Sequence, residues 1–258
     1  MMTALLEKKA FICDMDGVLY HGNKLLDGVV AFVNWLIESK KEFIFLTNSS
    51  ERSPAELSQK LNRLGLEVPK ERYYTSALAT ASFLSSQCPG GSAYVIGEAG
   101  LTNALYDAGM TMNNVNPDYV VVGESRTYNM ENIERAVHLV LKGAKLIGTN
   151  PDLTGPTEKG IVPATRALIA PIELATGVQA YFIGKPNPLM MRHAKKMLNT
   201  HSEDTVVIGD RMDTDILAGI EAGIDTVLVL SGVTDAAAMR KFPYQPKYVF
   251  NGVGDIIV

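Results

Sequence analysis

The chain has 258 residues, of which 47% are hydrophobic and 20% are charged, and its formal net charge is -4. This length allows one large domain or two modest ones with a real core. The mild acidity argues against a general nucleic-acid binder, which usually shows a concentrated basic stripe. Two cysteines, Cys13 and Cys88, are too few for a cysteine metal cluster or a disulfide framework.

The chain contains no run of about 18 apolar residues, which a membrane span would need. Its first ten residues include no apolar stretch long enough for a signal peptide. We therefore expect a cytoplasmic protein, a monomer or homodimer, that binds neither nucleic-acid polymers nor membranes.

Short apolar runs alternate with amphipathic stretches along the chain. The runs are near-continuous in apolar residues, which is typical of parallel strands covered on both faces. The predicted strands are Ala10–Cys13, Phe43–Leu46, Ala93–Ile96, Tyr119–Val122, Lys145–Gly148, Tyr181–Ile183, Thr205–Ile208, Thr226–Leu230 and Tyr248–Phe250.

Helices with recognisable ends lie between these runs. Ser53-Pro54-Ala55-Glu56 combines an N-cap serine, a proline at the first helical position and a glutamate placed for a capping box. Asn129 opens a helix whose apolar face stops at Gly143, and a third helix runs from about Pro188 to Leu198. Alternating strands and helices predict a doubly wound, Rossmann-like α/β fold.

The residues with chemical promise fall in two blocks, 14–49 and 185–215, and a long segment with its own strands and helices separates them. A segment that can close its own small sheet is typical of an inserted domain. We expect an α/β core domain made of residues 1–77 and 182–258, with a smaller α/β domain of residues 78–181 inserted into it.

The first chemical motif is Asp14-Met15-Asp16-Gly17-Val18, at the end of a predicted strand. Ends of such strands are where α/β sheets place their ligands. Two carboxylates two residues apart form a negative pocket suited to a hard cation, and Gly17 lets the chain turn sharply. An ordinary Asp-x-Asp-Gly surface turn would show the same residues, and this segment alone does not separate the two interpretations.

Two further strand ends carry groups that could bind a phosphate. Thr47-Asn48-Ser49-Ser50 offers hydroxyl and amide donors, although this composition is also common in loops and helix entries. Lys185, between Gly184 and Pro186, could neutralise a phosphate and a carboxylate that would otherwise repel each other. The alternative for Lys185 is an exposed lysine in a turn.

The fourth strand end is the segment Gly209–Asp215, which contains three aspartates. Acidic residues at the start of a helix suit its dipole, so capping alone could explain Asp213. Capping explains Asp210 poorly, because Asp210 lies at the strand end. Four such motifs, each at a strand end, are hard to obtain by accident.

Together the four segments resemble the signature motifs of the haloacid dehalogenase (HAD) superfamily, and the insertion between the second and third motifs resembles its type-II cap. The whole chain is most similar to the class IIA branch, and within it to the NagD-type nucleotide phosphatases. The segments of the insertion that carry this likeness are Tyr94–Glu98, Val121–Arg126 and Thr149–Asp152.

The resemblance implies a Mg²⁺-dependent phosphatase that works through an aspartyl-phosphate intermediate. Asp14 would be the nucleophile, and Asp16 would be the general acid and base. The Asp14 carboxylate, the Asp16 main-chain carbonyl and Asp210 would hold the metal. The residues implied to bind phosphate or substrate are Thr47, Asn48, Lys185, Arg211, Met212, Asp213, Thr214, Asn150 and Asp152.

The substrate is expected to be a small phosphorylated metabolite, with a nucleoside monophosphate such as uridine monophosphate as the leading candidate. Arg211–Thr214 resembles the general class IIA pattern more than the NagD loop. Pyridoxal, sugar, glycerol and aryl phosphates are therefore alternative candidate substrates. Asn150-Pro151-Asp152 would either reach the leaving group or form an ordinary turn. A non-catalytic metabolite-binding protein is the alternative from another class. The sequence retains every group that the phosphatase chemistry needs, which counts against that alternative.

Overall fold

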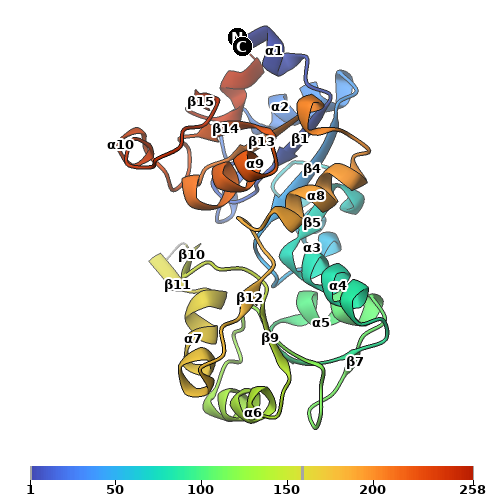
Figure 1. The fold of residues 1–258 in the computed structure, drawn as a ribbon. Helices are drawn as coiled ribbons and strands as arrows, with labels where there is room; N and C mark the ends of the chain where they lie inside the picture. The colour runs from blue at the N-terminus through green and yellow to red at the C-terminus, as the bar shows by residue number, and fades with distance from the viewer. Residues whose placement is uncertain (1, 158–159, 258) are drawn as a thin grey trace. The chain divides into compact units, whose positions relative to one another are not determined.

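The computed structural model describes residues 2–157 and 160–257, which form two compact units. The first unit contains residues 1–47, 58–74 and 185–258, and the second contains 48–57 and 75–184. In Figure 1 the two ends of the chain, blue and orange to red, build the first unit, while the green to yellow segments build the second. The expected boundaries at residues 77 and 182 stay a prediction.

The first unit is built on a six-stranded sheet with the order β15-β14-β13-β1-β4-β5. Every pairing from β15 to β4 is parallel, as the unbroken apolar runs predict. The strands are β1 (Ala10–Cys13), β4 (Glu42–Thr47), β5 (Tyr73–Thr75), β13 (Thr205–Gly209), β14 (Asp225–Val229) and β15 (Tyr248–Phe250). A small hairpin of β2 (Tyr20–His21) and β3 (Lys24–Leu25) follows β1.

Helices pack on this sheet through their apolar faces. Phe11 of β1 meets the ring of Phe32 edge-on at 6.3 Å and that of Trp35 at 5.4 Å between centroids. Such aromatic contacts add to the free energy of burying apolar surface. The helices of the chain's two ends are α1 (Met2–Leu6), α2 (Val29–Glu38), α3 (Pro54–Arg63), η1 (Lys70–Arg72), α8 (Pro188–Met197), η2 (Ser202–Asp204), η3 (Met212–Ile216), α9 (Leu217–Glu221), α10 (Ala236–Met239) and η4 (Val253–Ile257).

The second unit has its own parallel sheet, with the order β12-β9-β8-β6-β7. Buried residues of β8 and β9 pack with Leu139 of α6 and Ile169 of α7 in a separate apolar core. The elements are α4 (Ser76–Gln87), β6 (Ser92–Ile96), α5 (Ala99–Asp107), β7 (Thr111–Met112), β8 (Tyr119–Val122), α6 (Met130–Leu141), β9 (Lys145–Gly148), the ribbon β10 (Thr154–Thr157) and β11 (Gly160–Pro163), α7 (Thr165–Thr176) and β12 (Tyr181–Phe182).

The nine predicted strands are all present, each with both ends within one residue of the prediction. The helix starts are also confirmed. Ser53 and Glu56 form the reciprocal capping box, and the Asn129 side chain accepts a hydrogen bond from the Asn132 backbone. The doubly wound α/β class is therefore confirmed, with two parallel sheets.

The strands that the sequence did not reveal are short. They are β2, β3, β5, β7, β10 and β11, which have two to four residues each. Segments this short lack the sustained apolar run on which the prediction rests. In the part of the chain that the structure describes, none of the helices is long and apolar enough to pass through a membrane.

Candidate active site

The carboxyl ends of β1 and β13 bring Asp14 and Asp210 to the same edge of the first sheet. The two strands are neighbours in parallel register, with Cys13 opposite Ile208. The backbone N–H of Asp14 continues this ladder by donating to the Ile208 carbonyl at 2.8 Å. Residues that follow two adjacent parallel strands meet at the ligand edge of such a sheet.

Lys185 is buried between two carboxylates. Its Nζ lies 2.6 Å from Asp14 Oδ1 and 2.6 Å from Asp215 Oδ1, and its side chain is only 3% exposed. Although burial alone lowers the pKa of Lys185, the Asp14 and Asp215 carboxylates raise it above its ordinary value. The lysine is therefore a fixed positive charge beside Asp14, and the alternative of an exposed turn lysine is wrong.

A third carboxylate, that of Asp210, lies close to the two that bind this ammonium. One oxygen from each of Asp14, Asp210 and Asp215 lies within 4.8 Å of the others. Burial, followed by the neighbouring Asp215 charge, raises the pKa of Asp210 to about 6, and the same two causes raise that of Asp14. A single ammonium leaves this buried set with an excess of negative charge.

The two carboxylate oxygens of Asp210 have different surroundings. Its Oδ2 accepts from the Val233 backbone N–H at 2.7 Å. Its Oδ1 is buried and has no hydrogen-bond partner within the residues that the structure describes. A buried carboxylate oxygen without a donor is costly, and a hard cation is the ligand class that such an oxygen suits.

Three glycines leave room for the side chains of the carboxylate cluster. A Cβ on Gly17, whose φ is +80°, would lie 2.5 Å from Asp210 Oδ2, and one on Gly232 would lie 2.0 Å from the same atom. A Cβ on Gly209 would lie 2.2 Å from the Cβ of Asp215. No side chain fits at these three positions, so glycine is what lets Asp210 and Asp215 approach the backbone.

Asp16 occupies a different setting from the buried cluster. Its side chain is 43% exposed, and His21 Nδ1 lies 3.7 Å from its Oδ1. Burial raises the pKa of Asp16, while the charges of Lys60 and His21 lower it. The carboxyl therefore stays accessible and has a pKa above the ordinary value, as a group that exchanges protons during a reaction requires.

Thr47 ends β4, which is the neighbour of β1 on its other side. Cys13 is opposite Phe45, so Thr47 lies just beyond the position level with Asp14. Thr47 is 9% exposed. The structure thus brings this sequence-predicted residue to the same edge of the sheet as Asp14.

The predicted substrate-binding residues after Asp210, which include the start of η3, divide into two pairs. Arg211 binds Asp213 through two hydrogen bonds, of 3.1 and 2.9 Å, on an exposed surface. Met212 is fully buried in an apolar cluster with Ile216 and Leu228, and Thr214 is also buried. Substrate binding by these residues stays a prediction.

Asn48, Asn150 and Asp152 meet one another in the second unit. The Asn48 side-chain amide donates to Asp152 Oδ2 at 3.0 Å, and the Asn48 carbonyl accepts from Asn150 Nδ2 at 2.7 Å. Asn150 also donates to Glu124 Oε1 at 2.9 Å. Asn150 is completely buried, so the amide supports the backbone at Asn48. Leaving-group contact by Asn150 and Asp152 stays a prediction.

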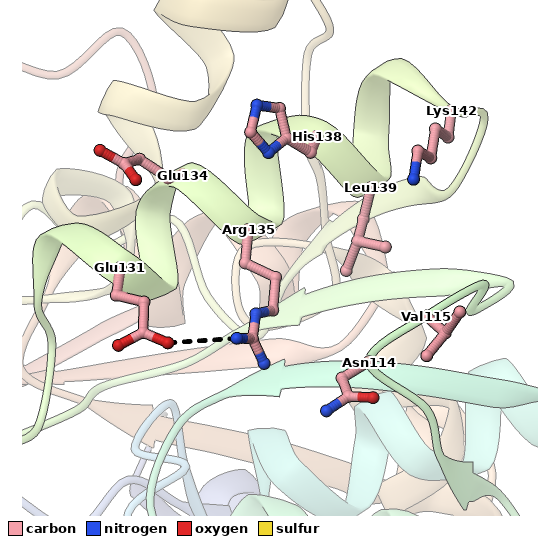
Figure 2. A pocket seen from close by; sticks show the side chains of 8 residues that line it. All are labelled: Asn114, Val115, Glu131, Glu134, Arg135, His138, Leu139 and Lys142. Carbon is pink, nitrogen blue, oxygen red and sulfur yellow. Dashed lines mark hydrogen bonds and ion pairs between the residues drawn. The ribbon is translucent and has the colours of Figure 1, made fainter.

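The second unit also has a surface hollow of about 390 Å³ along α6 (Figure 2). Charged side chains of both signs line it, and Glu131 pairs with Arg135 at 3.1 Å. Glu131 is exposed and Arg135 is partly exposed. A solvated hollow with paired charges shows none of the strained electrostatics of the carboxylate cluster.

Sequence reasoning missed three contributors to the site. Asp215 holds Lys185 and accepts from the Arg211 backbone at 3.2 Å. His21 lies beside Asp16. The loop 231–234 also binds Asp210 through Val233. The aspartates spaced along 210–215 were a usable signal for Asp215, whereas nothing local in the sequence marks the loop.

Two family models match the chain. A haloacid dehalogenase-like hydrolase model covers residues 11–111, and a HAD-hydrolase-like model covers residues 182–256. Together they contain every residue of the carboxylate cluster together with Lys185, Asp16 and Thr47.

Curated relatives and solved structures match nearly the whole chain. Dihydroxyacetone phosphatase of Corynebacterium glutamicum is 50% identical over 96% of this chain and 90% of that protein. Ribonucleotide monophosphatase NagD of Escherichia coli is 42% identical over 97% of this chain and 98% of its own. The NagD structure superposes with a TM-score of 0.91. A glycerol phosphate phosphatase from Mycobacterium tuberculosis, solved in complex with magnesium, is 29% identical, covers 97% of this chain and 76% of its own, and gives a TM-score of 0.91.

Proposed function

The chain belongs to the NagD-like class IIA phosphatases of the haloacid dehalogenase superfamily, and we propose that it transfers the phosphoryl group of a small phosphate monoester to Asp14. The observation that carries the proposal is the buried Lys185 ammonium, held 2.6 Å from both Asp14 and Asp215. A fixed cation beside the Asp14 carboxylate reduces its repulsion of an anionic phosphate.

The first step forms a bond between an Asp14 oxygen and phosphorus and breaks the bond from phosphorus to the leaving oxygen. Asp16 gives its proton to that departing alkoxide. Water then attacks the aspartyl-phosphate, Asp16 takes the proton from the water, and inorganic phosphate leaves with Asp14 restored. The partly exposed Asp16 carboxyl, with its raised pKa, supports this role.

Phosphate binding is assigned to Lys185, Thr47 and the Asn48 backbone. The burial of Thr47 and its position beyond the end of β4 support this assignment. Asp215 is added as the second partner that holds the Lys185 ammonium, an arrangement that the glycine at 209 allows. Substrate contact by Arg211–Thr214, Asn150 and Asp152 is retained as part of the proposal.

The donor set fits Mg²⁺. It consists of carboxylate oxygens, one of which, Asp210 Oδ1, is buried without a partner among the described residues. We assign the ion to the Asp14 and Asp210 carboxylates and the Asp16 main-chain carbonyl. When bound, Mg²⁺ supplies positive charge that offsets the repulsion between the carboxylate nucleophile and an anionic substrate. The magnesium complex of the glycerol phosphate phosphatase supports this choice of metal.

The identity of the leaving group is less well supported than the type of reaction. The relative at 50% identity acts on dihydroxyacetone phosphate and the one at 42% on ribonucleotide monophosphates. We therefore place dihydroxyacetone phosphate ahead of uridine monophosphate, which the sequence alone favoured. Glycerol, sugar, pyridoxal and aryl phosphates belong in the same comparison. A cytoplasmic location and a monomeric or homodimeric state stay predictions.

The test is hydrolysis of these phosphates and of p-nitrophenyl phosphate, each ranked by kcat/KM with Mg²⁺ and with EDTA. We expect metal-dependent release of phosphate, with dihydroxyacetone phosphate the best substrate. If uridine monophosphate is preferred by tenfold or more, the substrate assignment is wrong while the phosphatase mechanism stands. Absence of metal-dependent turnover on every ester would overturn the mechanism. The named relatives are phosphatases, which counts against a non-catalytic binding protein.

A further inference from the structure

His21 is the side chain that joins the acid/base aspartate to the loop after β14. The ring lies at the end of β2, with Nδ1 3.7 Å from Asp16 Oδ1 and Nε2 3.1 Å from the Ser231 carbonyl oxygen. The His21 side chain is 51% exposed, so core packing does not account for its position.

The contact with Ser231 determines which nitrogen of the His21 ring carries a proton. A carbonyl oxygen only accepts hydrogen bonds, so Nε2 must carry the proton and donate to it. Nδ1 is then the ring nitrogen that faces the Asp16 carboxyl, 3.7 Å from Oδ1. The Ser231 contact thus fixes the ring in the orientation that presents Nδ1 to Asp16.

Ser231 also fixes the turn that carries Asp16. Its Oγ donates to the Gly17 carbonyl at 2.7 Å, and the Gly17 N–H donates to the Tyr20 carbonyl at 2.9 Å. One residue thus anchors both the backbone just after Asp16 and the imidazole beside its carboxyl. Such outer contacts orient the groups that do the chemistry.

Lys60 is another basic residue that acts on Asp16. Lys60 Nζ lies 3.6 Å from the centre of the Tyr20 ring, and its charge, like that of His21, acts on the Asp16 carboxyl. Lys60 adds a positive charge near Asp16, and the imidazole plane of His21 offers a directional contact. His21 can therefore select an orientation of the carboxyl.

We propose that His21 is a positioning residue that fixes the orientation of the Asp16 carboxyl while Asp16 transfers protons to and from the leaving group. This inference rests on the proposed phosphatase mechanism. The separation of 3.7 Å is longer than a hydrogen bond, and catalytic hydrogen bonds are often long until substrate binds.

The test compares leaving groups that differ in their need for a proton. p-Nitrophenolate departs at neutral pH without one, whereas the alkoxide of dihydroxyacetone phosphate requires one. Because kcat/KM reports steps up to the loss of the leaving group, it isolates the acid role of Asp16. We expect His21→Ala to lower kcat/KM about tenfold or more for the alkyl ester and less than about threefold for p-nitrophenyl phosphate. The best alkyl phosphate of the panel replaces dihydroxyacetone phosphate if it is a better substrate.

Two conservative variants separate positioning from a structural clamp. His21→Gln can keep a donor for the Ser231 carbonyl but loses the contact at Nδ1, so we expect it to behave like His21→Ala. His21→Asn places an amide near the Nδ1 position, and we expect it to recover part of the alkyl-ester activity. The matched control is His201→Gln. It removes an exposed histidine whose backbone carbonyl accepts a hydrogen bond from Thr205, and it should leave kcat/KM unchanged for both substrates.

Equal losses on both substrates, full rescue by His21→Gln, or no loss at all would each overturn the proposal. The concentration of Mg²⁺ that half-protects the protein against thermal unfolding should match that of the wild type, and a large change would mean that His21 acts on the metal site instead. If wild-type protein hydrolyses neither ester, the proposed function itself has failed. Wild-type turnover without a leaving-group effect in His21→Ala rejects only the role of His21.

Discussion

The two units bury polar groups in opposite ways. In the first, the Lys185 ammonium pairs with Asp14 and Asp215, Asp210 lies close to both carboxylates, and one Asp210 oxygen has no partner among the described residues. In the second, both oxygens of Glu124 are occupied. Oε1 accepts from Asn150 at 2.9 Å, and Oε2 accepts from the backbone and hydroxyl of Ser50.

The difference separates polar groups that serve the fold from polar groups that serve a ligand. A fully satisfied network such as that of Glu124 specifies one arrangement of the chain and needs nothing else. A network left with excess charge costs folding free energy, and it is retained where a substrate or ion completes it. Removing a negative charge from the first network should therefore reduce activity without reducing stability, whereas changing Glu124 should reduce stability more than activity.

Asp14→Asn should have the largest effect on activity. The amide keeps the shape of the side chain but cannot attack phosphorus, so kcat for p-nitrophenyl phosphate should fall by roughly 10⁴-fold or more. The unfolding temperature should stay equal or rise, because one crowded negative charge is removed. Asp107→Asn on the exposed end of α5 is the control. Near-normal turnover in Asp14→Asn would show that another residue is the nucleophile.

Lys185→Met should reduce both the activity and the stability of the protein. Without the ammonium, Asp14 and Asp215 face each other uncompensated, so we expect kcat/KM to fall at least about 100-fold through both KM and kcat. The free energy of unfolding in EDTA should fall by about 3 kcal/mol. Kinetics and urea unfolding measure the two effects. Lys196→Met on the exposed face of α8 is the matched control and should change neither.

Glu124→Gln should affect stability more than chemistry. Glutamine has a single acceptor oxygen, so one of the contacts with Ser50 or Asn150 is lost, and the free energy of unfolding should fall by about 1–2 kcal/mol. We expect kcat for p-nitrophenyl phosphate to stay within about threefold of wild type. A stable protein with a collapsed kcat would contradict the comparison, because Glu124 would then belong to the catalytic machinery.

Stabilisation of the fold by Mg²⁺ should be the smallest of these effects, and it should depend on pH. Asp210 has its pKa raised to about 6, so its carboxylate costs folding free energy above that pH, and the cost is relieved as protonation proceeds below it. Mg²⁺ needs the ionised form. With Mg²⁺ at ten times its Kd, the unfolding temperature at pH 7.5 should exceed that in EDTA by about 3–5 °C. The difference should shrink as the pH falls through about 6. Equal protection at pH 5.5 and 7.5 would exclude Asp210 as a ligand.

Much of the fold could be predicted from local pattern. The strands that carry the site residues are unbroken apolar runs, and each stands in the structure within a residue of its predicted ends. Short strands such as β5 escaped prediction, because three residues give no periodicity. Helix starts at Ser53 and Asn129 were predictable since their caps act within three residues.

The site was predictable where its residues directly follow strands. Asp14 and Asp210 have this property, Lys185 lies three residues after the end of β12, and the structure brings Asp14 and Lys185 into contact. His21 and Ser231 were not predictable, because 210 residues separate the two partners in the chain. Asp215 was visible in the sequence as one of several aspartates, yet only its approach to Lys185 distinguishes it from a helix cap.

The sequence by itself determined the class of fold, the order of the chemical groups and the type of reaction, because strand patterns and strand-end motifs are local properties of the chain. Only the tertiary structure decided which charges face each other. The pairing of Lys185 with Asp215, the hydrogen bond from Val233 to Asp210 and the contact of His21 with Ser231 all join distant segments. Such contacts depend on how parallel strands are ordered in the sheet and on glycines that let side chains approach the backbone. No local sequence pattern predicts the strand order or these close approaches.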